Sequence, residues 1–244
     1  RFVDLICGAA ASAIYQIQSQ ERQNETSSAI VSAMATLTEF RDNETGRHVE
    51  RVTTFSLLLA RELSRQPAFY REIDEEFLAQ LERAVPLHDI GKVAIPDYIL
   101  LKPGRLTPEE QQKMREHARL GAATIEALIA RKVGNGFLVM ARDIAWCHHE
   151  WYDGSGYPRG LSGEEIPLAA RIASVADVYD ALTTRRVYKP AQTHAQAVEI
   201  IRAGAGTQFD PRVVQAFLDS QDAFAHAAAT LADDAPATCL SAAS

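Results

Sequence analysis

The sequence predicts an all-α protein. Apolar residues recur at three- or four-residue spacing in most segments, as they do in a helix that buries one face. Several segments also begin with residues that cap helices, such as a threonine or an aspartate followed by proline. The strict apolar/polar alternation of a half-buried strand is scarce. These three observations favour a fold built from helices.

Residues 1–40 are rich in Ala, Ser and Gln and carry only a thin apolar pattern. Such a segment suits a linker or signalling helix that arrives from an upstream domain better than it suits a core helix. The chain begins at Arg1 rather than Met, so we expect a longer protein with an upstream sensory or receiver domain. The same helix could pair in parallel with its copy, which makes a homodimer an expectation.

The main domain is expected to cover residues 41–220. Residues 49–63 show one apolar face at helical spacing. Thr107, Pro108 and Glu110 form a cap, a first-turn proline and a capping-box acid, and they predict a helix that runs to about residue 131. Two later helices have similar start signals, Thr193 with Gln196 and Asp210 with Pro211.

Two stretches break the helical pattern. Residues 151–167, WYDGSGYPRGLSGEEIP, contain four glycines and two prolines. A loop of this length inside a helical domain is uncommon unless it serves a function. Residues 221–244 are low in complexity and are expected to form a frayed or disordered tail.

The composition of the 244 residues is that of a globular protein, with 47% hydrophobic and 23% charged residues. A formal net charge of −7 argues against binding to duplex nucleic acid, so an anionic substrate needs locally placed positive charge. The three widely spaced cysteines fit a reducing compartment, and a cytoplasmic location is expected. No apolar stretch approaches the ~20 residues of a membrane span.

The histidines carry the strongest functional signal, because five of the seven lie in spaced motifs with acidic residues. Imidazole nitrogens and carboxylate oxygens are the ligands that hold iron, manganese or zinc where water is activated. A shared metal centre explains their density. The motifs are Glu44-x-x-x-His48, His88-Asp89-x-x-Lys92, His117, His148-His149 and Asp177.

Two of these motifs contain adjacent ligands. If His88 and Asp89 lie in the last turn of a helix, their side chains diverge by about 100° and Asp89 can bridge two metals. His148 and His149 form a second pair, which is expected to end a helix before the glycine-rich loop. A bridging carboxylate flanked by imidazoles indicates a two-metal hydrolase. Lys92 lies one turn further along and could stabilise developing negative charge.

The extended motifs are His88-Asp89-Ile90-Gly91-Lys92 and His148-His149-Glu150-x-x-Asp153-Gly154-x-Gly156-Tyr157-Pro158-x-Gly160-Leu161. Together, in this order, they closely resemble the HD-GYP phosphodiesterases, a branch of the HD hydrolases, over about residues 40–218. The resemblance implies an HD-type helical bundle with a long GYP loop and two or three metals. It also implies hydrolysis of cyclic di-GMP to pGpG, GMP or both, as the output module of a bacterial signalling protein.

The resemblance assigns roles to single residues. Asp89 and Lys92 are expected to be catalytic. Iron or manganese is expected ahead of zinc or nickel, although such ligands suit all four. The expected metal ligands are His48, His88, Asp89, His117, His148, His149 and Asp177.

Substrate contacts are implied in the same way. Gly156, Tyr157 and Pro158 belong to the loop that shapes the substrate pocket in the family. Arg186 and Lys189 match basic residues that contact the phosphates and bases of the nucleotide. They would supply the local positive charge that an acidic protein needs.

Glu44 decides the expected number of metals. A carboxylate four residues before His48 shares its helical face, although Gly46 between them could distort that turn. Family members with a glutamate at this place resemble a three-metal subgroup. We therefore expect a trinuclear centre in which Glu44 holds the outer ion and a bridging hydroxide attacks phosphorus.

Residues close to the motifs have less specific expectations. Glu150 and Asp153 are expected to orient the ligands rather than bind metal. Asp42 is expected to pair with Lys92 or another cation, and Cys147 to pack as a core thiol. Three alternative functions remain: a non-catalytic cyclic dinucleotide receptor, a phosphodiesterase that prefers cyclic GMP-AMP, and an HD hydrolase of another nucleotide. The complete ligand set favours an enzyme.

Overall fold

The computed structural model describes residues 15–16, 22, 29, 31, 33–38, 41–42, 47–131, 136–184 and 191–232. Within these ranges the chain is helical and has no strand, so the all-α prediction is confirmed. The elements, with η denoting a 3-10 helix, are α2 (His48–Ser64), α3 (Glu75–Ala84), η1 (Val85–Leu87), η2 (Ile90–Ala94), α4 (Asp97–Leu100), α5 (Pro108–Ala130), α6 (Gly136–Cys147), η3 (Gly163–Glu165), α7 (Leu168–Thr183), α8 (His194–Ala203), α9 (Pro211–Asp219) and α10 (Gln221–Thr230).

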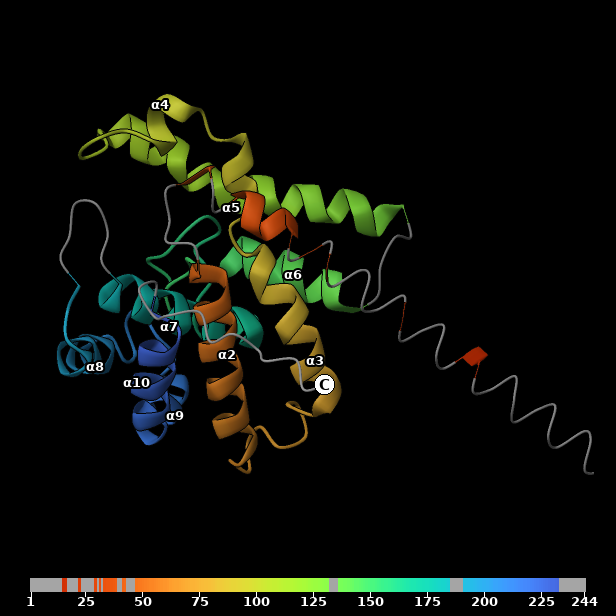
Figure 1. Ribbon diagram of the computed structural model, residues 1–244, viewed down its shortest axis with the longest axis vertical. Coiled ribbons are helices and arrows are strands. Elements are labelled where there is room, and N and C mark those ends of the chain that lie inside the picture. The colour runs from red at the N-terminus through yellow and green to blue at the C-terminus, as the bar shows by residue number, and fades with distance from the viewer. Residues whose placement is uncertain are drawn as a thin grey trace, which may run out of the picture.

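Helix α2 lies in the middle of the bundle and packs against α3, α7, α9 and α10. At the top of Figure 1, α5 lies over α6, and it also contacts η2. The core-facing side of α2 consists of Val52, Phe55, Leu59 and Leu63, each with an exposed fraction of 0%. These residues belong to the apolar face that the sequence predicted between residues 49 and 63.

The predicted helix starts are confirmed. Thr107 accepts a hydrogen bond from the backbone N–H of Glu110, and the Glu110 carboxylate accepts one from the N–H of Thr107, which completes the capping box of α5. Thr193 and Gln196 form the same arrangement at α8. Asp210 caps α9 ahead of its first-turn proline. These caps succeed as predictions because both partners lie within one helical turn.

The expected low-complexity tail is wrong for residues 221–230, which form α10. Phe224 is fully buried, stacks on Phe55 at 4.9 Å between ring centroids, and meets Tyr179 and Phe217 edge to face. Burying one such ring contributes about 1.5–3 kcal/mol, enough to dock a short alanine-rich helix. Residues 233–244 lie outside the described residues.

Only short stretches of the expected signalling helix are described. Residues 33–38 are helical, and Ala35 and Thr38 are buried among them. Most of residues 1–40 lie outside the described ranges, so the signalling helix, the upstream domain and the homodimer stay predictions. No described helix combines the length and the apolar composition that a membrane crossing requires.

A buried ion pair fastens the end of the long loop to α9. Arg171 donates to the carbonyl of Ile166 at 2.9 Å and to Asp210 Oδ2 at 2.5 Å, and Asp210 also accepts from Arg212. Burial by itself raises the pKa of Asp210, but the hydrogen bonds and charges of the two arginines hold it below its ordinary value of 3.8.

Asp210 should therefore stabilise the fold above pH 3.8 and lose this contribution as the pH falls through the lower pKa of the folded state. We expect Asp210→Asn to lower the free energy of unfolding at pH 7, with a difference from the wild type that narrows toward pH 3. Urea unfolding of both metal-free proteins at pH 7, 5 and 3 would measure it. A difference that is constant with pH would contradict the linkage.

Candidate metal centre

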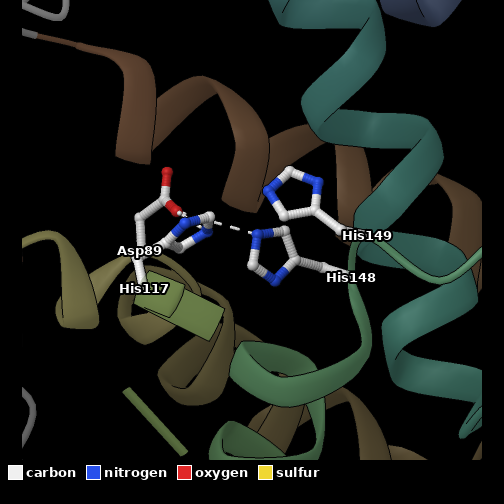
Figure 2. Close-up of side chains that lie close together, drawn as sticks. All are labelled: Asp89, His117, His148 and His149. Carbon is white, nitrogen blue, oxygen red and sulfur yellow. Dashed lines mark ion pairs between the residues drawn. The ribbon is translucent and has the colours of Figure 1, made fainter. Parts of the chain in front are cut away.

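Asp89 lies at the centre of a ring of histidines supplied by four parts of the chain. The Nε2 atom of His117, from α5, lies 3.2 Å from Asp89 Oδ1, and that of His148, at the end of α6, lies 3.7 Å from the same oxygen. The Nε2 atom of His88 lies 3.3 Å from Asp89 Oδ2. Figure 2 shows Asp89 and His117 facing His148 and His149. Each oxygen of this carboxylate therefore faces at least one imidazole nitrogen.

The local structure around Asp89 differs from the expected last turn of a helix. His88 is the C-cap of η1 and Asp89 is the N-cap of η2, so the pair lies between two 3-10 helices. Pro86 has no N–H to continue α3. Gly91 lies so close to α5 that a Cβ atom there would stand 1.9 Å from the carbonyl oxygen of His117. This approach of η2 to α5 is what sets Asp89 beside His117.

Three histidines share one orientation. Their Nδ1 atoms face backbone carbonyls: His88 with Val85 at 2.9 Å, His117 with Met114 at 2.7 Å and His148 with Ile144 at 3.0 Å. An Nδ1–H that donates there leaves the lone pair of a neutral ring on Nε2.

These three Nε2 atoms and Asp89 Oδ1 are buried without a hydrogen-bond partner. A lone pair that faces a carboxylate repels it unless a proton or a metal ion lies between them. The arrangement therefore fits metal ions.

Two groups of side chains could each hold an ion, and both include Asp89. Within each group the ligand atoms lie within 4.8 Å of one another. His48 Nε2 also lies 3.8 Å from Asp177 Oδ1 on α7, so Asp177 borders the group that contains His48 and His88, which is called the second group below. Glu44 lies outside the described residues. The groups are Asp89, His117, His148 and His149, and His48, His88 and Asp89.

Burial and neighbouring charges shift the pKa values of these residues in different directions. Burial raises the pKa of Asp89, but Lys92 and His88 outweigh it and hold the pKa well below its ordinary value. Burial and the neighbouring histidines hold the pKa of His149 well below its ordinary value, so this ring stays neutral. Burial lowers the pKa of His88, but Asp89 and Asp177 more than offset it and raise the pKa to about 9. A metal ion held by His88 would therefore have to displace a proton.

Lys92 joins the cluster from the side. Its Nζ atom lies 2.8 Å from Asp89 Oδ2 and forms a second ion pair with Asp42. The expected pairing of Asp42 with Lys92 is confirmed. The Asp42 and Asp89 carboxylates hold the Lys92 ammonium group in place, and only 13% of the Lys92 side chain is exposed. Lys92 is therefore placed to donate to a charged group that reaches Asp89.

The GYP loop covers one side of the cluster. The Tyr157 ring stacks on His149 with 4.7 Å between centroids and 28° between planes, and its backbone N–H donates to the His149 carbonyl. Burial, above all, raises the pKa of Tyr157, so its hydroxyl stays protonated. Gly156 has no room for a side chain, because a Cβ atom would stand 2.1 Å from the Trp151 nitrogen. Pro158 follows Tyr157 and is exposed.

Glu150 acts on this loop rather than on the ligands. Its buried carboxylate accepts hydrogen bonds from the backbone N–H groups of Arg159 at 2.7 Å and Leu161 at 3.1 Å. Asp153 likewise accepts from the N–H of Ser155 at 2.8 Å. Both residues shape the loop instead of orienting the metal ligands, which corrects the expectation. Cys147 is buried, as predicted.

The sequence reasoning missed two residues of the site. Arg115, exposed on α5, places its guanidinium 4.7 Å from the centre of the Tyr157 ring. Asp180 contacts His48 Nδ1 at 2.7 Å. Asp180 could have been found, because it lies one helical turn after Asp177. Nothing in the sequence marked Arg115 as a site residue, because it looks like any other charged residue on the exposed face of a helix. Arg186 and Lys189 lie outside the described residues.

Residues 21–213 match the model of the HD domain family. A cyclic di-GMP phosphodiesterase of Vibrio cholerae is 46% identical over 87% of this chain and 44% of its own length. A 3′3′-cGAMP-specific phosphodiesterase of the same organism is 39% identical over 86% of this chain and 38% of its own. The chain thus spans less than half of these relatives.

A solved structure shows the same fold. A cyclic GMP-AMP specific phosphodiesterase of Vibrio cholerae superposes with a TM-score of 0.57 at 19% identity, covering 84% of this chain and 50% of that one. Its helical fold supports the predicted HD-type bundle.

Proposed function

This chain belongs to the HD domain family, in its HD-GYP branch, and on that premise we propose that it is a metal-dependent phosphodiesterase that hydrolyses cyclic di-GMP to pGpG, GMP or both. The observation that carries the proposal is the Asp89 carboxylate, whose two oxygens face histidines from different elements. Such a shared carboxylate is what a centre with adjacent metals requires.

We propose that two or three divalent transition ions occupy the site, with iron or manganese ahead of zinc and nickel. His117, His148 and His149 would hold one ion and His48 and His88 another, with Asp89 common to both. Asp177 would complete the second group, and Glu44 would hold the third ion. When bound, the ions would supply Lewis-acid activation of a water molecule and of the phosphodiester oxygens.

The chain's own residues complete the chemistry. Lys92 would donate hydrogen bonds to the phosphoryl oxygens as negative charge develops on them, and its pairing with Asp42 and Asp89 fixes its position beforehand. The GYP loop would form a wall of the substrate pocket through Gly156, Tyr157 and Pro158. Arg186 and Lys189 would bind phosphates or guanine, as their counterparts do in the family.

Arg115 is a further candidate for binding the anionic substrate. The structure shows no ion pair for its guanidinium within the described ranges, and its face rests on Tyr157. Its donor edge is therefore available for a phosphate. We expect Arg115→Ala to raise KM about tenfold, the value of one charge-assisted contact, with metal content unchanged.

Arg119→Ala is a matched control for Arg115, because Arg119 is an exposed arginine of the same helix that pairs with Glu116 at 2.8 Å. It should leave KM unchanged. Equal KM values for Arg115→Ala and the wild type would remove Arg115 from substrate binding.

The test of the function is a turnover assay. Protein purified without oxygen would be loaded with Fe²⁺ or Mn²⁺ and incubated separately with cyclic di-GMP, 3′3′-cGAMP and linear pGpG. We expect cyclic di-GMP to be consumed and pGpG or GMP to form. Binding of cyclic di-GMP without product would favour the receptor. Faster cleavage of 3′3′-cGAMP would move the chain to the specificity of its 39% identical relative.

A further inference from the structure

His48 is held differently from the other histidines of the centre. The Nδ1 atoms of His88, His117 and His148 face backbone carbonyls. His48 Nδ1 instead lies 2.7 Å from the Oδ2 atom of Asp180, a carboxylate. A carboxylate on the far nitrogen fixes the ring and its tautomer, and it makes the Nε2 atom a more electron-rich ligand. The contact is buried on both sides, since His48 is 2% exposed and Asp180 is 1% exposed.

Arg51 holds Asp180 in place. Its Nε atom donates to Asp180 Oδ1 at 2.5 Å, and an amino group of the same guanidinium donates to Oδ2 at 3.2 Å. Thr184 Oγ1 donates to Oδ1 at 3.2 Å. A buried carboxylate stays charged only when such partners compensate for lost water. Because both oxygens are occupied, the carboxylate that faces His48 cannot turn away.

The ion pair of Arg51 and Asp180 lies next to only one of the two groups of candidate ligands. Asp177 and Asp180 lie one turn apart on α7 and meet opposite edges of the His48 ring, with Asp177 Oδ1 at 3.8 Å from Nε2 and Asp180 Oδ2 at 2.7 Å from Nδ1. The pair therefore supports the group made of His48, His88 and Asp89. The group made of Asp89, His117, His148 and His149 does not include His48.

The last described helix, α10, also contacts this pair. Arg51 donates to the carbonyl of Leu231 at 3.3 Å, and Leu231 is the C-cap residue that follows α10. Helix α10 is anchored by Phe224, which stacks on Phe55 of α2, one turn after Arg51. The end of α10 thus helps to set the position of Arg51, and Arg51 sets Asp180.

We propose that Asp180 and Arg51 are positioning residues that hold His48 as a ligand for one ion of the centre, and that the end of α10 completes their support. This inference rests on the proposed metal centre. It predicts that loss of the Asp180 charge weakens one ion selectively and leaves the ion of His117, His148 and His149 in place.

The test is titration of metal-free protein with Mn²⁺, followed by calorimetry and elemental analysis, so that it needs no turnover. Asp180→Asn keeps the shape of the side chain and removes its charge. We expect one Mn²⁺ to bind 10- to 100-fold more weakly than in the wild type, with the affinity of the ion held by His117, His148 and His149 unchanged.

Asp210→Asn is the matched control. Asp210 is equally buried and also pairs with an arginine at 2.5 Å, but its partner is Arg171, near the start of α7. It should lose stability without losing metal affinity. If both variants only become less stable and bind Mn²⁺ like the wild type, the role assigned to Asp180 is wrong. If the wild type itself binds no metal, the proposed function fails first.

Arg51→Lys covers the case in which Asp180→Asn does not fold. It keeps the positive charge but loses the two-point contact with Asp180. We expect the same single ion to bind several-fold more weakly. Wild-type affinity in folded Arg51→Lys would overturn the proposal.

Discussion

Asp89→Ala is expected to lower bound metal strongly and to abolish turnover. Asp89 is the only residue shared by the two ligand groups found among the described residues, so its loss removes a ligand from both ions at once. We expect bound metal to fall below half of the wild-type content and cyclic di-GMP turnover to reach background. Elemental analysis and the product assay on the same preparation would measure both.

Asp219→Ala is a control for this substitution, because Asp219 is an exposed acid at the end of α9, where it accepts a hydrogen bond from Gln215. It should change neither quantity. An Asp89→Ala protein with full metal content and near wild-type turnover would show that Asp89 bridges nothing.

Lys92→Ala is expected to lower kcat by roughly 10²-fold or more, as the loss of a donor to developing charge does in other active sites. Metal content should be retained or rise, because the substitution removes a cation that lies 2.8 Å from Asp89 and competes with the metal for that carboxylate. KM should change less than kcat, since the proposed contact strengthens only in the transition state.

Lys113→Ala serves as the control, because Lys113 is exposed on α5, where its ammonium group donates to the Tyr98 hydroxyl. Its kinetics should equal those of the wild type. An unchanged kcat in Lys92→Ala would exclude the lysine from the mechanism.

The sequence predicted the fold best where the signal was local. The caps at Thr107, Thr193 and Asp210 were found because a cap and its partner lie within four residues. Phe224 was missed as a core residue because its partners come from α2, α7 and α9, and a single aromatic among alanines has no visible period. The conformation at His88 and Asp89 was also missed, because a tertiary contact decides it.

The sequence predicted the ligand residues of the site better than the contacts that hold them in position. Spaced motifs indicated which histidines meet Asp89, and the structure brings all five of them to one place with Asp177. The chemistry of a ligand is visible in its residue type, whereas the contact that orients it is not. Glu150 looked like a residue that orients ligands, yet it holds the loop backbone.

The contact between Gly91 and α5 also bears on how the site opens. Gly91 faces Gly121 as well as the backbone at His117, so two glycines without side chains join η2 to α5. Segments that are joined so closely tend to open and close as one cooperative unit. We therefore expect the same free energy of local opening at Asp89 and at His117, although the two residues are far apart in the sequence. We also expect fluctuations of the long helix α5 to move the Asp89 carboxylate together with His117, so that the distance between these two side chains changes little.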